Sequence, residues 1–311
     1  MRYTEENFPR STIQRDGMKI LQGHIDETSC MTICDVVYRK VENYILHLHI
    51  ILPTQNKDET KKFPTIVFVQ GSAWHKQTLG REIVQLGRIV NLGYVVAIVE
   101  YRPSDVALFP AQIIDVKYAV QYMVEHENEY CVDINNLILW GTSSGAHTAL
   151  MTAFTKGLDK FRTQELKEYE FKCIIDYFGP TDVYEMRFQP SLGEHYTKDC
   201  PEGLLLGQVV TRENSMDTVV MKYVEKDKWI PPVLIVHGDM DKSVPFHQSV
   251  LLYDKLIKCK KNVQFYKIKH AGHGGSEFWN KEVLGIVNEF ISIYISNERA
   301  QSLFSFLNKL C

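Results

Sequence analysis

The chain has 311 residues, in which 35 Lys and Arg against 38 Asp and Glu give a net charge of −3. Hydrophobic residues make up 45% and charged residues 23% of the sequence, which is typical of globular proteins and excludes disordered chains, collagens and coiled coils. The near-neutral charge argues against a nucleic-acid partner, which would require a basic excess, and against electrostatic attraction to a membrane.

The first ten residues contain no apolar stretch typical of a signal peptide, and no apolar run of 18 residues predicts a transmembrane helix. Seven cysteines at irregular spacing favour reduced, structural thiols over a disulfide framework. Cys30 and Cys34 have the spacing of half a zinc site, but no second pair follows them. Together these features predict a cytoplasmic protein. The sequence is compatible with a homo-oligomer but does not specify the oligomeric state.

Short apolar runs without alternation are typical of strands buried on both faces of a parallel sheet. Such runs occupy residues 65–70, 94–99, 137–140, 173–178, 233–236 and 263–268. Segments with helical periodicity lie between and after them, at residues 80–92, 110–130, 145–157, 245–258 and 277–308. Strands that alternate with helices predict a mostly parallel α/β sheet flanked by helices. β-rich residues at 36–53 predict an antiparallel hairpin ahead of that sheet.

Residues 181–230 interrupt this alternation with prolines, glycines and many charges. We interpret them as a cap-like insertion over the carboxyl edge of the sheet, within a single domain that spans residues 1–311. Loops at this edge commonly carry specificity while the scaffold beneath them is rigid. We therefore expect the insertion to shape a substrate pocket.

The sequence Gly141-Thr142-Ser143-Ser144-Gly145 follows one predicted strand and precedes a predicted helix. A G-x-S-x-G pattern in this setting is typical of a nucleophile elbow, a tight turn that lifts the serine hydroxyl above the sheet edge. Ser143 is therefore the candidate nucleophile. Taken alone, the five residues would be explained equally well by a Gly/Ser turn without chemistry.

A serine nucleophile needs a histidine base and a carboxylate that orients it. Two later strands end at such residues: one runs into Asp239 and Asp241, and the next into His270 and His273. We select His273, because His270 continues the strand whereas His273 lies in a glycine-flanked loop. Composition does not separate Asp239 from Asp241. The acid must reach sideways to His273 from the loop after the strand, and this favours Asp241, which lies further along that loop. The order Ser, Asp, His is that of the α/β-hydrolase fold.

The oxyanion of an acyl-transfer reaction needs hydrogen-bond donors. We expect them from the backbone N–H of Ser144 and from the loop after residues 65–70, where Ser72 or Ala73 can serve. Trp74 in the same loop is a candidate for the substrate-binding wall, although ordinary core packing explains it as well. His147 is expected to pack one helical turn after the motif. His75 and His195 are pocket candidates that the sequence does not place.

Over residues 62–289 these motifs resemble an α/β-hydrolase of the esterase/lipase superfamily, and most closely its feruloyl- or acetyl-esterase-like branch. In such relatives a His-Gly-x-x-Asp pattern followed by Val-Pro provides the acid, which here falls on Asp241. Many relatives have His-Gly-Gly-Gly-Trp where this chain has Gln70-Gly71-Ser72-Ala73-Trp74. The resemblance therefore does not decide which residue of this loop donates to the oxyanion. Arg102 and Asp115 resemble a structural pair of the family.

The resemblance implies a serine hydrolase that cleaves small carboxylic esters through an acyl-enzyme, without a metal or organic cofactor. Its expected substrates are acetyl or feruloyl esters, including those on carbohydrate fragments. Two alternatives remain open at this stage. One is an amidase or peptidase with the same triad, such as a formamidase, and the other is a catalytically silent binding protein on the same scaffold.

Overall fold

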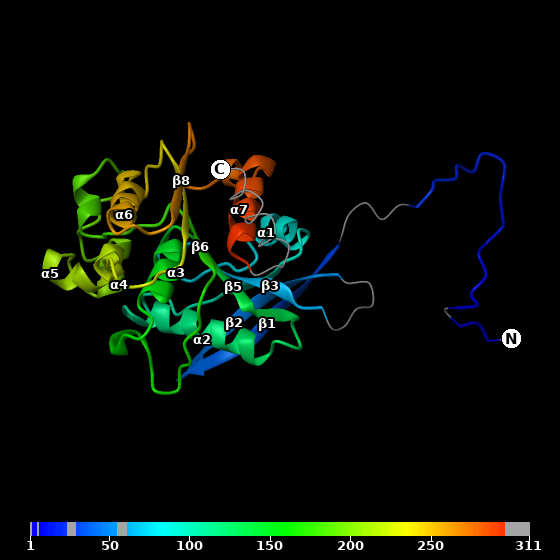
Figure 1. Cartoon of the computed structure of the whole chain (residues 1–311), viewed down its shortest axis with the longest axis horizontal. Coiled ribbons are helices and arrows are strands. Elements are labelled where there is room, and N and C mark those ends of the chain that lie inside the picture. Colours follow the sequence, from blue (N-terminus) through cyan, green and yellow to red (C-terminus); the bar gives the residue numbers. More distant parts are fainter. Residues whose placement is uncertain (1, 5, 24–28, 55–60, 296–311) are drawn as a thin grey trace, which may run out of the picture.

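A computed structural model describes residues 2–4, 6–23, 29–54 and 61–295. Its centre is an eight-stranded sheet in the order β1-β2-β4-β3-β5-β6-β7-β8 (Figure 1). The strands are β1 (Cys30–Val41), β2 (Tyr44–Pro53), β3 (Phe63–Val69), β4 (Val95–Val99), β5 (Val132–Thr142), β6 (Cys173–Tyr177), β7 (Val233–Gly238) and β8 (Val263–Ile268). All of the strands predicted from apolar runs are present, and the mostly parallel α/β-hydrolase architecture is confirmed.

The amino-terminal edge of the sheet is antiparallel. β1 and β2 form a hairpin in which Val41 pairs with Tyr44, and β2 runs antiparallel to β4. All pairs from β4 through β3 to β8 are parallel. The hairpin expected at residues 36–53 is therefore confirmed, but it begins earlier, at Cys30. Its first strand is largely exposed and interrupted by register shifts near residues 33–36, which explains why the sequence pattern is weak there.

Alternate residues of the central strands enter two separate cores, one on each face of the sheet. In β3, Val67 and Val69 belong to one core, whereas Ile66 and Phe68 belong to the other. All four side chains are fully buried. Because both faces are covered, the strands need apolar residues at every position, which is why their sequences lack alternation.

Five helices cover the two faces: α1 (Ile83–Val90), α2 (Ala111–Glu125), α3 (Ser144–Phe154), α6 (His247–Lys258) and α7 (Lys281–Tyr294). α1 and α7 lie side by side over one core, and α2, α3 and α6 pack on the other (Figure 1). All five predicted helices are present. α2 is shorter than predicted because the polar residues 126–130 form turns, and residues 296–308 of the last predicted helix lie outside the described residues.

The segment 181–230 lies between β6 and β7 in the chain. It contains α4 (Pro201–Leu206), α5 (Arg212–Ser215) and three single turns of 3-10 helix at residues 185–188, 216–218 and 220–223. Among the described residues, no helix combines the length and the apolar character needed to cross a membrane. The six cysteines in the described part of the chain are free thiols, of which Cys173 is buried and Cys131 partly exposed.

One buried carboxylate joins three elements of the scaffold. Asp115 in α2 is fully buried and accepts two hydrogen bonds from the Arg102 guanidinium, at 2.8 and 3.0 Å. It also accepts the Arg102 backbone N–H (3.0 Å) and the guanidinium of Arg39 in β1 (2.5 Å). The pairing of Arg102 with Asp115 implied by the family resemblance is present, and Arg39 adds a partner that the sequence did not indicate.

We expect Asp115→Ala to lower the free energy of unfolding by about 3 kcal/mol, because it leaves two guanidinium groups without their buried partner. Urea unfolding followed by circular dichroism measures the change. Glu125→Ala is the matched control on the same helix, since Glu125 forms an exposed pair with Lys167 that contributes less than about 1 kcal/mol. Equal losses in the two variants would contradict the structural role of Asp115.

Candidate active site

Ser143 occupies a sharp turn between β5 and α3. Its backbone has φ 52° and ψ −128°, a strained conformation for a residue that carries a side chain. A Cβ on Gly141 would overlap the backbone of Gly145 and Ala146, and one on Gly145 would overlap the carbonyl oxygen of Val69. The two glycines of the motif are therefore required by close backbone approach, as expected for a nucleophile elbow.

The three side chains selected from the sequence form one continuous hydrogen-bonded row. Ser143 Oγ lies 2.8 Å from His273 Nε2, and His273 Nδ1 lies 2.7 Å from Asp241 Oδ2. The side chain of His273 is 26% exposed and that of Asp241 is fully buried. The ring of Phe178 packs edge-on against the imidazole, with 4.8 Å between centroids. A serine in this position can transfer its proton to the imidazole while the carboxylate holds the ring.

Asp241 is the more heavily bonded of the two candidate carboxylates. It also accepts hydrogen bonds from His237 Nε2 (3.1 Å) and from the backbone N–H groups of Ser243 (2.8 Å) and Val244 (2.9 Å). Burial alone would raise the pKa of Asp241, but the hydrogen bonds from His237 and His273 outweigh it and hold that pKa below its ordinary value. The carboxylate therefore stays ionised.

Asp239 and His270, which we did not select as acid and base, lie outside the row of Ser143, His273 and Asp241. Asp239 Oδ1 accepts the backbone N–H of His270 at 2.7 Å, which joins the turns that follow β7 and β8. His270 is exposed and has a positive φ of 63°. Neither residue contacts Ser143 or His273 through a hydrogen bond of the described structure. The geometry thus brings together the residues that we selected and places Asp239 in a turn-stabilising position.

The loop after β3 provides the candidate oxyanion donors. The N–H groups of Ser72 and Trp74 donate to the Ser144 hydroxyl at 3.0 and 3.2 Å, so the Ser72 N–H already has an acceptor. The Ala73 N–H between them has no acceptor within the described residues, and neither has the N–H of Ser144. Of the two loop residues left open by the sequence, the structure therefore leaves Ala73 as the available donor.

A side chain that the sequence analysis left unassigned holds this loop. The Gln70 side-chain N–H donates to the Thr78 carbonyl oxygen, and its amide oxygen accepts the Thr78 backbone N–H, both at 2.9 Å. The same amide nitrogen also donates to the carboxylate of Glu82. Burial raises the pKa of Glu82, and the hydrogen bond from Gln70 partly offsets that increase. Gln70 stands where many relatives have histidine, and here it fastens the loop to the residues just before α1.

Trp74 and His147 pack against each other beneath the site. Trp74 is 2% exposed, and its ring meets that of His147 edge-on at 5.4 Å. His147 Nε2 bonds to the carbonyl oxygen of Thr218 at 2.9 Å, and burial lowers the pKa of His147 from 6.5 to about 4. Trp74 borders the cavity described next, but most of its surface is covered by packing.

A cavity of about 680 Å³ opens over Ser143 and His273. Its floor is the loop of residues 71–74 together with Ser143 and Ser144, and Trp279 borders one side. One wall comes from the 181–230 segment, through Met186, Leu192, Gly193, Glu194, His195, Cys200, Pro201 and Glu202. His195 thus borders the cavity, whereas His75 is exposed and does not.

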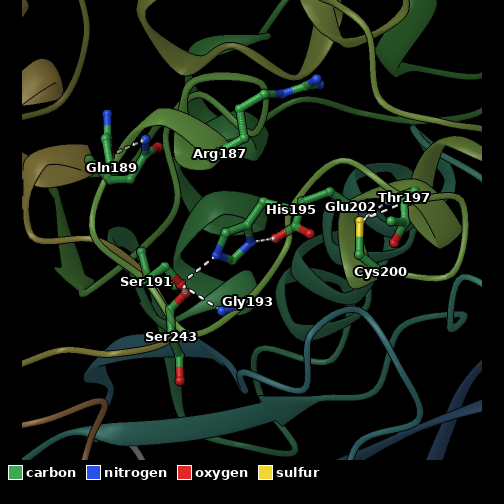
Figure 2. Close-up of polar contacts among 12 residues, drawn as sticks. Arg187, Gln189, Ser191, Gly193, His195, Thr197, Cys200, Glu202 and Ser243 are labelled. Carbon is green, nitrogen blue, oxygen red and sulfur yellow. Dashed lines mark hydrogen bonds and ion pairs between the residues drawn. The ribbon is translucent and has the colours of Figure 1, made fainter.

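The sequence analysis did not predict the hydrogen-bond partners of three polar residues of the site, His237, Gln70 and His195. His237 lies near the end of β7, four residues before Asp241. That short spacing was a usable sequence signal for a contact between the two side chains. Gln70 pairs with Glu82 across twelve residues. Ser191, His195 and Glu202 form a hydrogen-bonded row (Figure 2), of which His195 and Glu202 border the cavity. Within the described part of the chain, no three His, Cys, Asp or Glu side chains gather in a metal-binding arrangement.

The chain is similar to a known protein family and to proteins described as esterases. The family model described as BD-FAE matches residues 48–256. Esterase LipC of Mycobacterium tuberculosis is 23% identical over 69% of this chain and 54% of its own length. A probable isoprenylcysteine alpha-carbonyl methylesterase of Oryza sativa is 25% identical over 62% of this chain and 47% of its own. The chain therefore spans about half the length of the curated relatives it matches.

Solved structures show the same fold. A truncated carbohydrate esterase from gut microbiota superposes with a TM-score of 0.73 at 25% identity, covering 87% of this chain and 98% of its own. A thermophilic esterase from Thermogutta terrifontis gives a TM-score of 0.68 at 21% identity, covering 86% of this chain and 94% of its own.

A fluorophosphonate probe, which reacts with activated serine hydroxyls, is expected to label Ser143, because Ser143 Oγ is hydrogen-bonded to an imidazole that can accept its proton. Ser143→Ala should abolish the labelling, as measured by intact mass and peptide mapping. Ser191→Ala is the matched control, since Ser191 lies equally close to a histidine, His195. Labelling that persists in Ser143→Ala, or that maps to Ser191, would contradict the assignment.

Proposed function

Because the chain belongs to the BD-FAE family, we propose that it is a serine hydrolase of small carboxylic esters. The observation that carries this proposal is the unbroken row from Ser143 through His273 to the ionised Asp241, with the N–H groups of Ala73 and Ser144 unpaired beside it. A nucleophile, a base with its orienting carboxylate, and free N–H donors are the components that acyl transfer requires.

In the proposed reaction, Ser143 Oγ attacks the acyl carbon while His273 Nε2 accepts the hydroxyl proton. Asp241 orients the imidazole and stabilises its cation, and the N–H groups of Ser144 and Ala73 donate to the oxyanion. His273 then protonates the departing alcohol, which leaves an acyl group on Ser143. The same imidazole activates the water that releases the acid and regenerates the serine.

We propose acetyl or feruloyl esters, including those on carbohydrate fragments, as the substrates. The structurally similar protein from gut microbiota is described as a carbohydrate esterase, and a cavity of about 680 Å³ is large enough for a small acyl group with a sugar-sized alcohol. In this proposal the 181–230 segment is a cap within one domain, and its side chains determine the alcohol that is accepted. The cytoplasmic location and the absence of nucleic-acid and membrane partners stay predictions.

A panel of acetyl, butyryl and feruloyl esters with a matched formanilide tests the proposal. We expect turnover of esters well above that of the anilide. In Ser143→Ala we expect ester turnover to fall by about 10⁴-fold or more, which is typical when a triad nucleophile is removed. Ester turnover in Ser143→Ala equal to that of the unmodified enzyme would exclude the mechanism. Turnover of the anilide alone would move the enzyme to the amidases.

The two aspartates of the β7 turn give a matched pair of variants. Asp241→Asn should lower kcat by about 10⁴-fold, because the amide no longer holds the reactive tautomer of His273. Asp239→Asn keeps an acceptor for the His270 N–H. We therefore expect its turnover to stay close to that of the unmodified enzyme and its free energy of unfolding to change by less than about 1 kcal/mol. Turnover and thermal unfolding measured on both variants check this, and a reversed pattern would assign the acid to Asp239.

A further inference from the structure

A buried tyrosine outside the row of Ser143, His273 and Asp241 contacts the loop that provides the oxyanion donors. Tyr101 lies two residues after the end of β4, and it has no exposed surface. Its hydroxyl oxygen lies 3.0 Å from Ser72 Oγ, 3.2 Å from the carbonyl oxygen of Gln70 and 3.4 Å from Ser144 Oγ. No step of the reaction proposed above uses Tyr101.

The direction of these hydrogen bonds follows from the single proton that each hydroxyl can donate. The Ser72 hydroxyl donates to the carbonyl oxygen of His75 at 2.6 Å, so the contact between Ser72 and Tyr101 is a donation from the tyrosine. Ser144 Oγ accepts the N–H groups of Ser72 and Trp74 at 3.0 and 3.2 Å. Its own proton is left for Tyr101 Oη, the remaining hydrogen-bond partner of this hydroxyl within the described residues.

Tyr101 keeps its proton and therefore joins these hydroxyls in one direction. Burial raises the pKa of Tyr101 above its ordinary value, and the hydrogen bond with Ser144 partly offsets that increase. The tyrosine thus accepts the proton of Ser144 and donates its own into the loop, towards Ser72 Oγ and the carbonyl oxygen of Gln70. Because Ser144 is only 1% exposed, water cannot readily replace Tyr101 as the acceptor of its proton.

The loop needs such support because its backbone is strained. Ala73 and Trp74 have positive φ angles of 53° and 56°, which cost energy for residues that carry a side chain. In this conformation the N–H groups on both sides of Ala73 bond to Ser144 Oγ, and within the described residues the Ala73 N–H has no acceptor. A Ser144 hydroxyl without a fixed acceptor could rotate and would hold its two N–H donors less firmly.

Resting on the ester hydrolase function proposed above, we infer that Tyr101 is a positioning residue for the oxyanion donors. By accepting the proton of the Ser144 hydroxyl, it keeps both lone pairs of Ser144 Oγ directed at the N–H groups of the loop. The strained loop is thereby held with the Ala73 N–H free for the oxyanion before a substrate enters. Tyr101 does not touch the reacting atoms and acts through Ser144.

A trifluoromethyl ketone measures this arrangement without ester turnover. Ser143 Oγ adds to its carbonyl carbon, the serine proton passes to His273, and the former carbonyl oxygen becomes an oxyanion that the N–H donors bind. We compare trifluoromethyl butyl ketone with methyl butyl ketone, which has the same carbon skeleton but is too weakly electrophilic to be captured by the serine. The dissociation constant of each is measured by competition with fluorophosphonate labelling of Ser143.

In Tyr101→Phe we expect the dissociation constant of the trifluoromethyl ketone to rise by about 10-fold, the loss typical of one hydrogen bond, and that of the methyl ketone to stay within about twofold. For an acetyl ester, kcat should fall by the same factor while KM is unchanged, because only the transition state uses the oxyanion donors. Tyr94→Phe is the matched control and should change neither ketone, since Tyr94 is also buried but donates to Asn288 in α7.

Ser144→Ala keeps the backbone N–H of Ser144 and removes the hydroxyl through which Tyr101 acts. This variant should also bind the trifluoromethyl ketone about 10-fold more weakly, and adding Tyr101→Phe should cause less than about a twofold further loss, because the two changes break one chain of hydrogen bonds. A merely structural role of Tyr101 would give additive losses and would weaken the binding of both ketones. If Tyr101→Phe fails to fold, unchanged affinity for the trifluoromethyl ketone in Ser144→Ala would refute the inference.

The ketones also separate this inference from the proposed function. If the unmodified enzyme prefers the trifluoromethyl ketone but turns over no ester, the proposed function fails, and the preference still measures the role of Tyr101. An unchanged preference in Tyr101→Phe would overturn the inference. So would an unmodified enzyme that binds the two ketones equally, because no oxyanion would then be stabilised beside Ser143.

Discussion

The charged carboxylate of Asp241 is the group on which the arrangement of the site depends. It has no exposed surface, so its charge must be stabilised entirely by protein donors, and four of them converge on it: His237, His273 and the N–H groups of Ser243 and Val244. A buried carboxylate with this many partners is rigid as well as ionised. His273 therefore stands in one orientation above Ser143 before any substrate enters.

Steric contact around the nucleophile sets the second constraint. Ser143 can rise above the sheet because Gly141 and Gly145 let β5, α3 and β3 approach more closely than any side chain would permit. A Cβ on Gly71 would likewise overlap Ser143 and the carbonyl of Thr142. The same close approach brings the loop after β3 against the start of α3, where the free N–H groups of Ala73 and Ser144 lie. Nucleophile and oxyanion donors are thus products of one packing contact.

These two constraints explain what could be predicted from the sequence. The strands, the elbow and the positions of Ser143, Asp241 and His273 follow from local patterns, because each of these residues lies in the turn that follows a strand of the parallel part of the sheet. The choice between Ser72 and Ala73 could not be predicted. It depends on the positive φ of Ala73 and on the Ser144 hydroxyl, which occupies the neighbouring N–H groups.

The polar contacts of the 181–230 segment and the partner of Asp115 in β1 were beyond prediction for a different reason. The 181–230 segment has few regular elements, so its path, and with it the meeting of His195 and Glu202, is determined by tertiary packing rather than by periodicity. The link from Arg39 in β1 to Asp115 in α2 spans 76 residues and has no local signature. Long-range pairs of this kind become visible only when the fold is known.

The 181–230 segment and the row of Ser143, His273 and Asp241 share a short stretch of backbone. The N–H of Leu192 and the hydroxyl of Ser191 both bond to the carbonyl of Lys242, at 2.8 and 3.1 Å. The next two residues, Ser243 and Val244, donate their N–H groups to Asp241. This stretch thus holds the carboxylate that bonds to His273 and also the segment that forms one wall of the cavity. A rigid connection of this kind keeps the wall at a fixed distance from Ser143. In the function proposed above, this is the geometric requirement for recognising the alcohol portion of an ester while its acyl carbon meets Ser143.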